Sequence, residues 1–351
     1  MHIAKRLTTA IALTLGVAAA AHAEETPSFQ IAWTIYAGSM PLGYAEQVGI
    51  LDKWADRYGV DIQAVQLNDY IEAQNQYTAG QFDGVIAIAL DALTIPAAIG
   101  VDSTVVMPLS ASAGSDGIVM KGKDKSVEDL KGARINLMEF SGSHYLLVRA
   151  LDQHGMSERD LSLVNTSDAD IITAFQSSDS DAVATWKPQL SVILEQNPDS
   201  TVIFDSADIP NEITDVLLVH TDTLEEHPEL GYALAGAWYE VMSRLQADYP
   251  DRTEVMAFMA DAVGTDPAGF QKQIDTIHFF TPEEATQLVT SQDFADTLES
   301  ITHFAWDKGL LGQGATGPDA VGVQFGEAHV LGNEQNVNLR FPTSYMERYT
   351  Q

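Results

Sequence analysis

The sequence predicts an α/β protein made of two lobes that are joined by two chain crossings. Apolar strand segments alternate with helical apolar periodicity over residues 29–109, and the same alternation restarts after a Gly/Ser/Ala stretch at 110–117. A further apolar strand, at 216–220, then returns the chain before a mostly helical remainder. Such alternation favours parallel sheets with helices on their faces.

In the first half, short apolar strands alternate with helices that have recognisable ends. Gly59 and Gly80 are suited to terminate two helices, and Asp69 and Asp91 are suited to cap the starts of the next two. We predict strands at 29–34, 60–67, 84–90 and 101–109, and helices at 43–58, 69–79 and 91–99.

The second half repeats this pattern, and it implies the domain boundaries. After an extended segment at 117–121 and a helical turn at 127–132, we predict strands at 133–138, 161–165, 181–185, 201–204 and 216–220, and helices at 143–154, 168–176 and 188–196. From Thr223 nearly everything reads as helix, and the Gly-rich stretch from Gly309 is expected to wind over a surface. Lobe 1 is therefore expected to comprise 24–117 and 216–351, and lobe 2 to comprise 118–215.

The first 23 residues have the organisation of a cleaved secretory signal peptide. Lys5 and Arg6 precede a small-residue apolar stretch, and Ala21-His22-Ala23 is an A-x-A cleavage site, which places the mature start at Glu24. The apolar stretch is too short to cross ~30 Å of hydrocarbon, which argues against a retained membrane helix. We expect export to the periplasm.

Composition restricts the function classes. Asp and Glu outnumber Lys and Arg by 50 to 18, so a nucleic acid or an anionic membrane is not the expected partner. The chain has no cysteine, which removes both disulfides and a lipid attachment site, and the nine histidines have no metal-ligand spacing. No catalytic or phosphate-binding motif is present, and we expect no cofactor, no metal and no enzymatic activity.

Five ordered segments resemble the periplasmic solute-binding proteins of the nitrate/sulfonate/taurine class of ABC importers. The resemblance covers about residues 29–240 and is carried by Gly43-Tyr-Ala-Glu-Gln-Val-Gly49, Tyr77-Thr-Ala-Gly-Gln-Phe-Asp83-Gly84, Val127-Glu-Asp-Leu-Lys-Gly132, Gly142-Ser-His-Tyr-Leu-Leu147 and Asp181-Ala-Val-Ala-Thr-Trp186-Lys-Pro188. Within the class, Ala32-Trp-Thr-Ile-Tyr36, Leu67-Asn-Asp-Tyr70, Leu90-Asp-Ala-Leu93 and Val164-Asn-Thr-Ser-Asp168 are most similar to a subgroup linked to urea carboxylase pathways. For that subgroup the implied ligand is guanidine or urea.

The resemblance implies a type II periplasmic binding protein fold, in which two α/β lobes hold a ligand between them. It also implies a monomer that delivers its ligand to an ABC permease in the inner membrane. In open α/β sheets, ligands bind outside the carboxyl ends of the strands, which points to the same place independently. The loops at these ends are predicted at 33–40, 69–70, 91, 139–143, 166–168 and 185–186, with Asp215 at the return crossing.

Aromatic rings and carboxylates dominate these loops. The predicted ligand-binding residues are Trp33, Tyr36, Asp69, Asp91, Glu139, Ser141, Trp186 and Asp215. The two tryptophans and Tyr36 could instead fill a core, and Asp69 and Asp91 could serve only as helix caps. His144 is expected near the site with a structural or a ligand role, and Lys187 is expected to point to solvent.

This set fits guanidinium, a planar cation with N–H donors around its edge. Aromatic faces would stack on the ion, and carboxylates would bind its edge. Glu139, just before the start of a helix, would repel a sulfonate or nitrate at that helix N-terminus. Urea ranks second, because a neutral ligand leaves buried carboxylates uncompensated. A receptor for a sulfonate or nitrate anion remains an alternative, as does an enzyme of the pyrimidine-synthase type, which would need a histidine beside the ligand.

Overall fold

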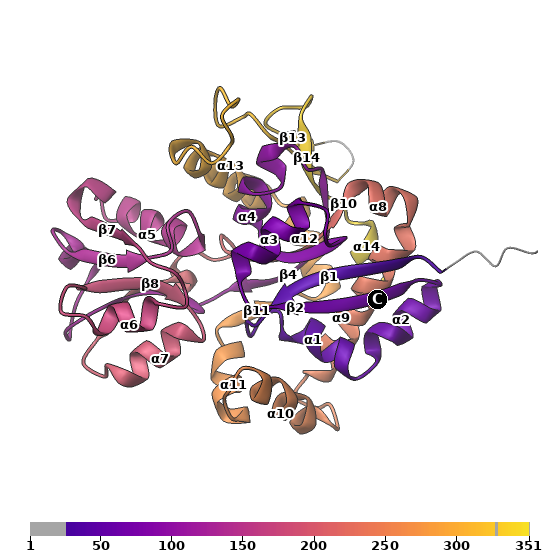
Figure 1. Ribbon diagram of the computed structural model, residues 1–351, viewed down its shortest axis with the longest axis horizontal. Helices are drawn as coiled ribbons and strands as arrows, with labels where there is room; N and C mark the ends of the chain where they lie inside the picture. Colours follow the sequence, from indigo (N-terminus) through magenta and orange to yellow (C-terminus); the bar gives the residue numbers. More distant parts are fainter. Residues whose placement is uncertain (1–25, 327–328, 351) are drawn as a thin grey trace, which may run out of the picture.

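The computed structural model describes residues 26–326 and 329–350, and it consists of two α/β lobes, each built on its own sheet. Figure 1 shows the smaller lobe, with β6, β7 and β8, at the left and the larger lobe at the right. The predicted signal peptide lies outside the described residues. In the part of the chain that is described, no helix is both long enough and apolar enough to cross a membrane.

The larger lobe contains a nine-stranded mixed sheet. Its order is β13-β12-β14-β4-β10-β3-β1-β2, and β11 pairs with β4. β1 pairs in parallel with β2 and β3, whereas β10 runs antiparallel between β3 and β4. The strands are β1 (Ser28–Thr34), β2 (Asp61–Leu67), β3 (Gly84–Ile88), β4 (Ser103–Ser112), β10 (Thr214–His220), β11 (Ile277–Phe279), β12 (Gly322–Phe325), β13 (His329–Leu331) and β14 (Val337–Phe341).

The smaller lobe contains a five-stranded sheet of order β7-β6-β8-β5-β9. β6 pairs in parallel with β7 and β8, and β5 runs antiparallel to both β8 and β9. Its strands are β5 (Asp116–Met120), β6 (Arg134–Leu137), β7 (Ser162–Asn165), β8 (Ala182–Trp186) and β9 (Thr201–Asp205).

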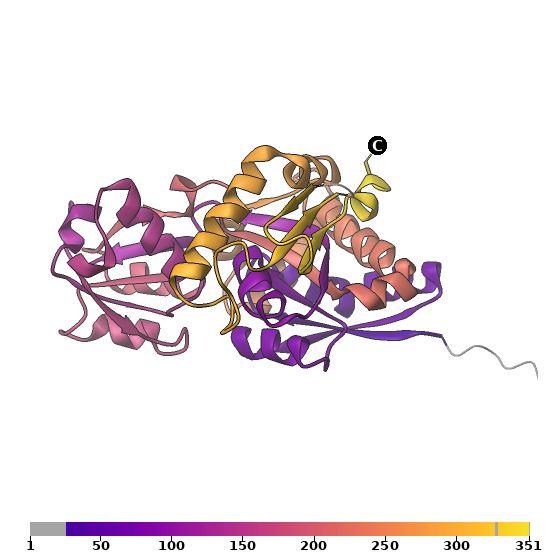
Figure 2. The same ribbon diagram turned by 90° about the horizontal axis from the view of Figure 1, so that it is seen from above.

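Helices cover both sheets, and Figure 2 shows both lobes from above. In the larger lobe they are α1 (Met40–Gln47), α2 (Ile50–Tyr58), α3 (Tyr70–Thr78), α4 (Ala89–Thr94), α8 (Thr221–Glu226), α9 (Pro228–Arg244), α10 (Arg252–Ala262), α11 (Pro267–Ile274), α12 (Pro282–Thr290), α13 (Gln292–Asp307) and α14 (Ser344–Glu347). In the smaller lobe they are α5 (Gly142–Gln153), α6 (Ile171–Gln176) and α7 (Gln189–Gln196). The predicted fold is confirmed.

Hydroxyl groups tie the two crossings together. The chain leaves the larger sheet at the end of β4 and re-enters it at the start of β10. Ser112, the last residue of β4, donates to Asp116 Oδ2 at 2.5 Å and lies 2.7 Å from the Ser206 hydroxyl, which belongs to the second crossing. Ser206 also accepts from the Gly114 backbone N–H at 2.8 Å. The two connections therefore form one hydrogen-bonded unit.

Side chains also connect the lobes away from the crossings. Phe304 on α13 packs edge-on against His144 and Tyr145 of α5. Lys308, directly after α13, pairs with Glu158 of the smaller lobe, which in turn contacts His144 Nε2 at 2.6 Å. These contacts fix α13 against the smaller lobe.

Three local predictions were wrong. The helix predicted at 43–58 is two helices, because Gly49 between them has a left-handed φ of 71°. The Gly-rich C-terminal stretch contributes β12, β13 and β14 to the larger sheet instead of winding over a surface. Asp91 lies inside α4, whose N-cap is Ile88, and so it does not cap that helix.

A close approach between α1 and β1 generates a testable prediction. A Cβ added to Gly43 would lie 2.4 Å from two atoms of the Trp33 indole ring. Although alanine favours a helix by ~1 kcal/mol relative to glycine, overpacking costs about 1–3 kcal/mol. Gly43→Ala should therefore lower the free energy of unfolding measured by urea denaturation. The loss should shrink in a Trp33→Phe background, where the ring is smaller, and equal losses in both backgrounds would contradict the packing account.

Candidate ligand-binding site

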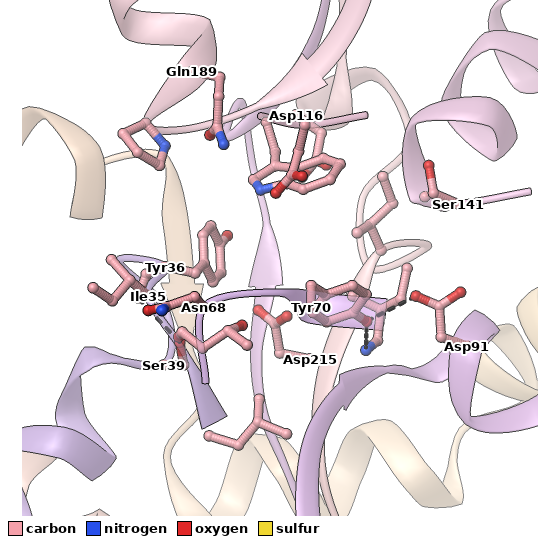
Figure 3. A pocket seen from close by; sticks show the side chains of 18 residues that line it. Ile35, Tyr36, Ser39, Asn68, Tyr70, Asp91, Asp116, Ser141, Gln189 and Asp215 are labelled. Carbon is pink, nitrogen blue, oxygen red and sulfur yellow. Dashed lines mark hydrogen bonds between the residues drawn. The ribbon is translucent and has the colours of Figure 1, made fainter. Parts of the chain in front are cut away.

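A pocket of about 280 Å³ lies between the lobes, where loops from both sheets meet. It is the place that the strand-end argument predicts, and Figure 3 shows its lining. The lining residues are Thr34, Ile35, Tyr36, Ser39, Asn68, Tyr70, Ile86, Ile88, Asp91, Asp116, Ser141, Gly142, Asp168, Trp186, Pro188, Gln189, Ile213 and Asp215.

Four aspartates line this pocket, and no lysine, arginine or histidine does so among the described residues. Asp91 comes from α4 and Asp215 from β10 in the larger sheet's lobe, Asp116 opens β5 at the crossing, and Asp168 lies in the loop before α6. Uncompensated carboxylates in a desolvated cavity are costly, since burial penalises their charged form. Positive charge or N–H donors placed in the pocket would offset this cost.

Asp116 and Asp215 stand at the two crossings. Ser110 donates to Asp215 Oδ2 at 2.7 Å, and Ser112 donates to Asp116 Oδ2 at 2.5 Å. Burial, followed by the charge of Asp116, raises the pKa of Asp215 to about 7, although the Ser110 hydrogen bond opposes this shift. Burial likewise raises the pKa of Asp116 to about 6 against its bond from Ser112. Burial therefore makes both carboxyl groups weaker acids than an exposed aspartate, and Asp215 more so than Asp116.

Asp91 is only 1% exposed and is held by Tyr70. The Tyr70 hydroxyl donates to Asp91 Oδ2 at 2.7 Å and accepts from the Ile88 backbone N–H at 3.0 Å. Burial raises the pKa of Asp91 to about 7, and the tyrosine hydrogen bond lowers it by less. Burial also raises the pKa of half-buried Asp168 at the pocket wall, with a further contribution from the charge of Asp69.

Aromatic rings supply the faces of the pocket. Tyr36, just after β1, donates its hydroxyl to Ser115 Oγ at 3.2 Å and so reaches the crossing. Burial, then the charges of Asp215 and Asp116, raise the pKa of Tyr36 well above its usual value. Figure 3 shows Tyr36 and Tyr70 on either side of Asp215. Trp186, the last residue of β8, joins the lining from the smaller lobe.

The N-terminus of α5 forms another part of the wall through Ser141 and Gly142. Ser141 is the N-cap: its hydroxyl accepts from Ser143 N at 3.2 Å and donates to Met138 O at 2.7 Å. A helix N-terminus favours negative charge. This wall is the part of the pocket in which an anionic group would be stabilised.

The structure brings five of the eight predicted residues into the lining: Tyr36, Asp91, Ser141, Trp186 and Asp215. The other three lie elsewhere. Trp33 is 6% exposed in the core, packed on Gly43. Asp69 is exposed and caps α3 by accepting from Glu72 N at 2.8 Å. Glu139 lies outside the lining, with its backbone N–H bonded to Asn165.

Lys187 and His144 do not line the pocket either. Lys187 Nζ donates to Thr276 Oγ1 at 2.8 Å in the other lobe, so the expectation that it points to solvent was wrong. His144 accepts from Phe140 N through Nδ1 at 3.0 Å and meets Glu158 through Nε2, a structural role. The described residues contain no cluster of three or more side chains suited to hold a metal ion.

Sequence reasoning did not single out Asp116, Tyr70, Asp168 or Gln189. Tyr70 and Asp168 lie in loops that the strand ends identified, so that signal was present. Asp116 lies in the Gly/Ser/Ala stretch, whose composition is that of a linker. The structure places it in the pocket, where its charge acts on Asp215. Gln189 opens α7, and its side-chain oxygen is buried with no hydrogen-bond partner among the described residues.

Comparison with known proteins agrees with this fold. Residues 56–240, more than half of the chain, match the NMT1/THI5-like family. The chain belongs to this family. The taurine-binding periplasmic protein of Escherichia coli (strain K12) is 31% identical over 146 residues, which are 41% of this chain and 45% of that protein. The chain thus spans less than half the length of this curated relative.

Solved structures are similar over much more of the chain. The alkanesulfonate-binding protein SsuA from Xanthomonas axonopodis pv. citri, bound to MOPS, has a TM-score of 0.67 at 20% identity and covers 83% of this chain and 96% of its own. The periplasmic nitrate-binding protein NrtA from Synechocystis PCC 6803 has a TM-score of 0.63 at 11% identity, with 83% and 84% covered. These two neighbours and the taurine-binding relative are binding proteins, not enzymes, and at such low identity the structural likeness establishes the fold.

The buried carboxyl groups predict an unusual dependence of stability on pH. The folded pKa of Asp215 lies above its unfolded value. The contribution of this carboxyl group to the free energy of unfolding is therefore fully present below about pH 4 and is lost as the pH rises through about 7. Asp215→Asn keeps an acceptor for Ser110 and removes this titration. The ligand-free variant should therefore have a higher thermal midpoint than the parent at about pH 8, and this difference should shrink steadily as the pH falls towards about 4. A lower midpoint at pH 8 would contradict the assignment.

Proposed function

We propose that the protein is the substrate-binding component of an ABC importer and captures a small organic cation rich in N–H donors. Guanidinium is the simplest such ligand. The observation that carries the proposal is the lining of four aspartates with no basic side chain among the described residues. The family and the binding proteins that share its fold support the general class. The proposed site of action is the periplasm, after removal of the leader that ends at Ala23.

The chemistry of the lining matches that of a guanidinium ion. A planar cation with donors around its edge needs acceptors in its plane and aromatic faces above it. Asp116 and Asp215 supply acceptors whose hydroxyl partners already occupy one oxygen of each. Tyr36, Tyr70 and Trp186 supply rings. Charge-assisted hydrogen bonds are the strong ones, and here they would form in a desolvated cleft.

Urea ranks second because it carries no charge. Protonated carboxyl groups could bind its oxygen, but this arrangement would be lost as the aspartates ionise. The two ligands therefore predict opposite pH trends: affinity for a cation rises as pH passes about 6–7, whereas affinity for urea does not.

A taurine-like zwitterion is the second candidate function, and a specific feature favours it. The N-terminus of α5 at Ser141 and Gly142 could hold a sulfonate, while the aspartates could hold the ammonium group. The taurine-binding relative makes this ligand class a natural comparison. A simple anion such as nitrate has no partner for the four carboxylates, so it ranks below both. An enzyme that consumes its own histidine ranks last, because the lining contains no histidine.

Calorimetry with matched ligands tests the proposal. At about pH 8 the parent protein should bind guanidinium and methylguanidinium, with urea, taurine and nitrate much weaker. Asp116→Asn should weaken guanidinium binding by roughly 30-fold or more, since a buried cation would lose a charge-assisted partner. Asp266→Asn, which alters the exposed N-cap of α11 outside the pocket, is the matched control and should leave the affinity unchanged. Tight taurine binding with no guanidinium binding would refute the cation assignment.

A further inference from the structure

Three of the four pocket carboxyl groups fall into two separate sets, and the fourth, Asp168, is half-buried in the loop before α6. Asp116 and Asp215 form one set: the charge of Asp116 contributes to the raised pKa of Asp215, and both charges act on Tyr36. Asp91 forms the other, since burial and its Tyr70 hydrogen bond account for its pKa without a neighbouring carboxylate.

Tyr70 stands between these sets. Its hydroxyl donates to Asp91, and the charge of Asp215 also contributes to raising its pKa, after burial and the charge of Asp91. Figure 3 shows the Tyr70 ring between Asp215 on one side and Asp91 on the other. A ligand that touches both sets must extend past this ring.

Each of the three carboxyl groups is anchored in the same way. Oδ2 accepts from a protein hydroxyl: Ser110 for Asp215, Ser112 for Asp116 and Tyr70 for Asp91. Oδ1 of each accepts no hydrogen bond from the described residues. A carboxylate can accept several hydrogen bonds, so each set has acceptor capacity left for a ligand donor.

The size of the pocket and its apolar wall also restrict the ligand. The pocket has a volume of about 280 Å³. A guanidinium ion has only four non-hydrogen atoms and would engage one set. Apolar side chains complete the wall: Ile35, Ile86, Ile88, Ile213 and Pro188. A hydrocarbon segment suits this wall better than water does.

We propose that the ligand has two N–H-donating ends joined by a short apolar segment, with a planar guanidinium or amidinium group at Asp116 and Asp215 and an ammonium group at Asp91. This inference rests on the proposed function and narrows its ligand class. The pair of carboxylates beside the Tyr36 ring matches a planar, delocalised cation, which needs two acceptors and a face. Asp91, a single carboxylate, matches a compact ammonium ion, which acts as a point charge.

The experiment uses aminoalkylguanidinium ions of increasing linker length, and each is matched with the alkylguanidinium ion that lacks the amine. Calorimetry at about pH 8 should find one aminoalkyl probe that binds the parent at least about tenfold more tightly than its matched partner. Asp91→Asn keeps an acceptor for the Tyr70 hydroxyl and removes the charge. It should abolish this difference, because only the aminoalkyl probe carries the ammonium group that would contact Asp91.

Asp116→Asn is the matched comparison, because it should weaken both kinds of probe together. Thermal midpoints of both variants at about pH 5 establish that they fold. Equal affinities of the paired probes at every linker length, or an equal loss for both in Asp91→Asn, would overturn the two-ended ligand while leaving a cation receptor in place. Binding of taurine or urea with no binding of any cation would instead overturn the proposed function, and the two-ended ligand with it.

Discussion

The site depends on the desolvation of carboxyl groups at the junction of two lobes. A buried aspartate either pairs with positive charge or keeps its proton, and no basic side chain reaches these aspartates among the pocket-lining residues. Asp215 and Asp116 sit on the crossings themselves, held by Ser110 and Ser112. The chain therefore keeps an electrostatic cost at the crossings between its lobes, and positive charge bound there would relieve that cost. Natural proteins often place such strain at functional sites.

The pocket is lined by residues of both lobes and of the crossings, so a bound ligand would contact both lobes. Ser112 bonds to Asp116 and to Ser206, so the first crossing, the second crossing and a pocket carboxylate share one hydrogen-bonded unit. Asp168 and Trp186 reach the pocket from the smaller lobe, whereas Asp91 and Tyr36 reach it from the larger one. A ligand that contacts both groups of residues must favour arrangements in which the lobes approach each other.

The sequence predicted the fold well because its signals are local. Strand ends, helix stops such as Gly59 and the cap at Asp69 can be read from a few neighbouring residues. The wrong predictions have a common cause: contacts between residues far apart in the sequence decided the outcome, and a local sequence pattern does not show these contacts. Trp33 is the penultimate residue of β1, yet its side chain packs on Gly43 in the core. Asp116 lies in a stretch with the composition of a linker, but the fold brings it into the pocket, where its charge acts on Asp215. The C-terminal strands were not predicted because their pairing is with distant parts of the chain: β14 pairs with β4, and so attaches β12 and β13 to the larger sheet.

Proton release on binding tests the central claim most directly. Guanidinium keeps its charge throughout the accessible pH range, so its binding must ionise the carboxyl groups that it contacts. Calorimetry in buffers of different ionisation enthalpy should find about one proton or more released per bound ion at about pH 6, declining towards zero at about pH 8.5. Binding with no proton release at pH 6, or with proton uptake, would contradict the view that ionising buried aspartates receive the ligand.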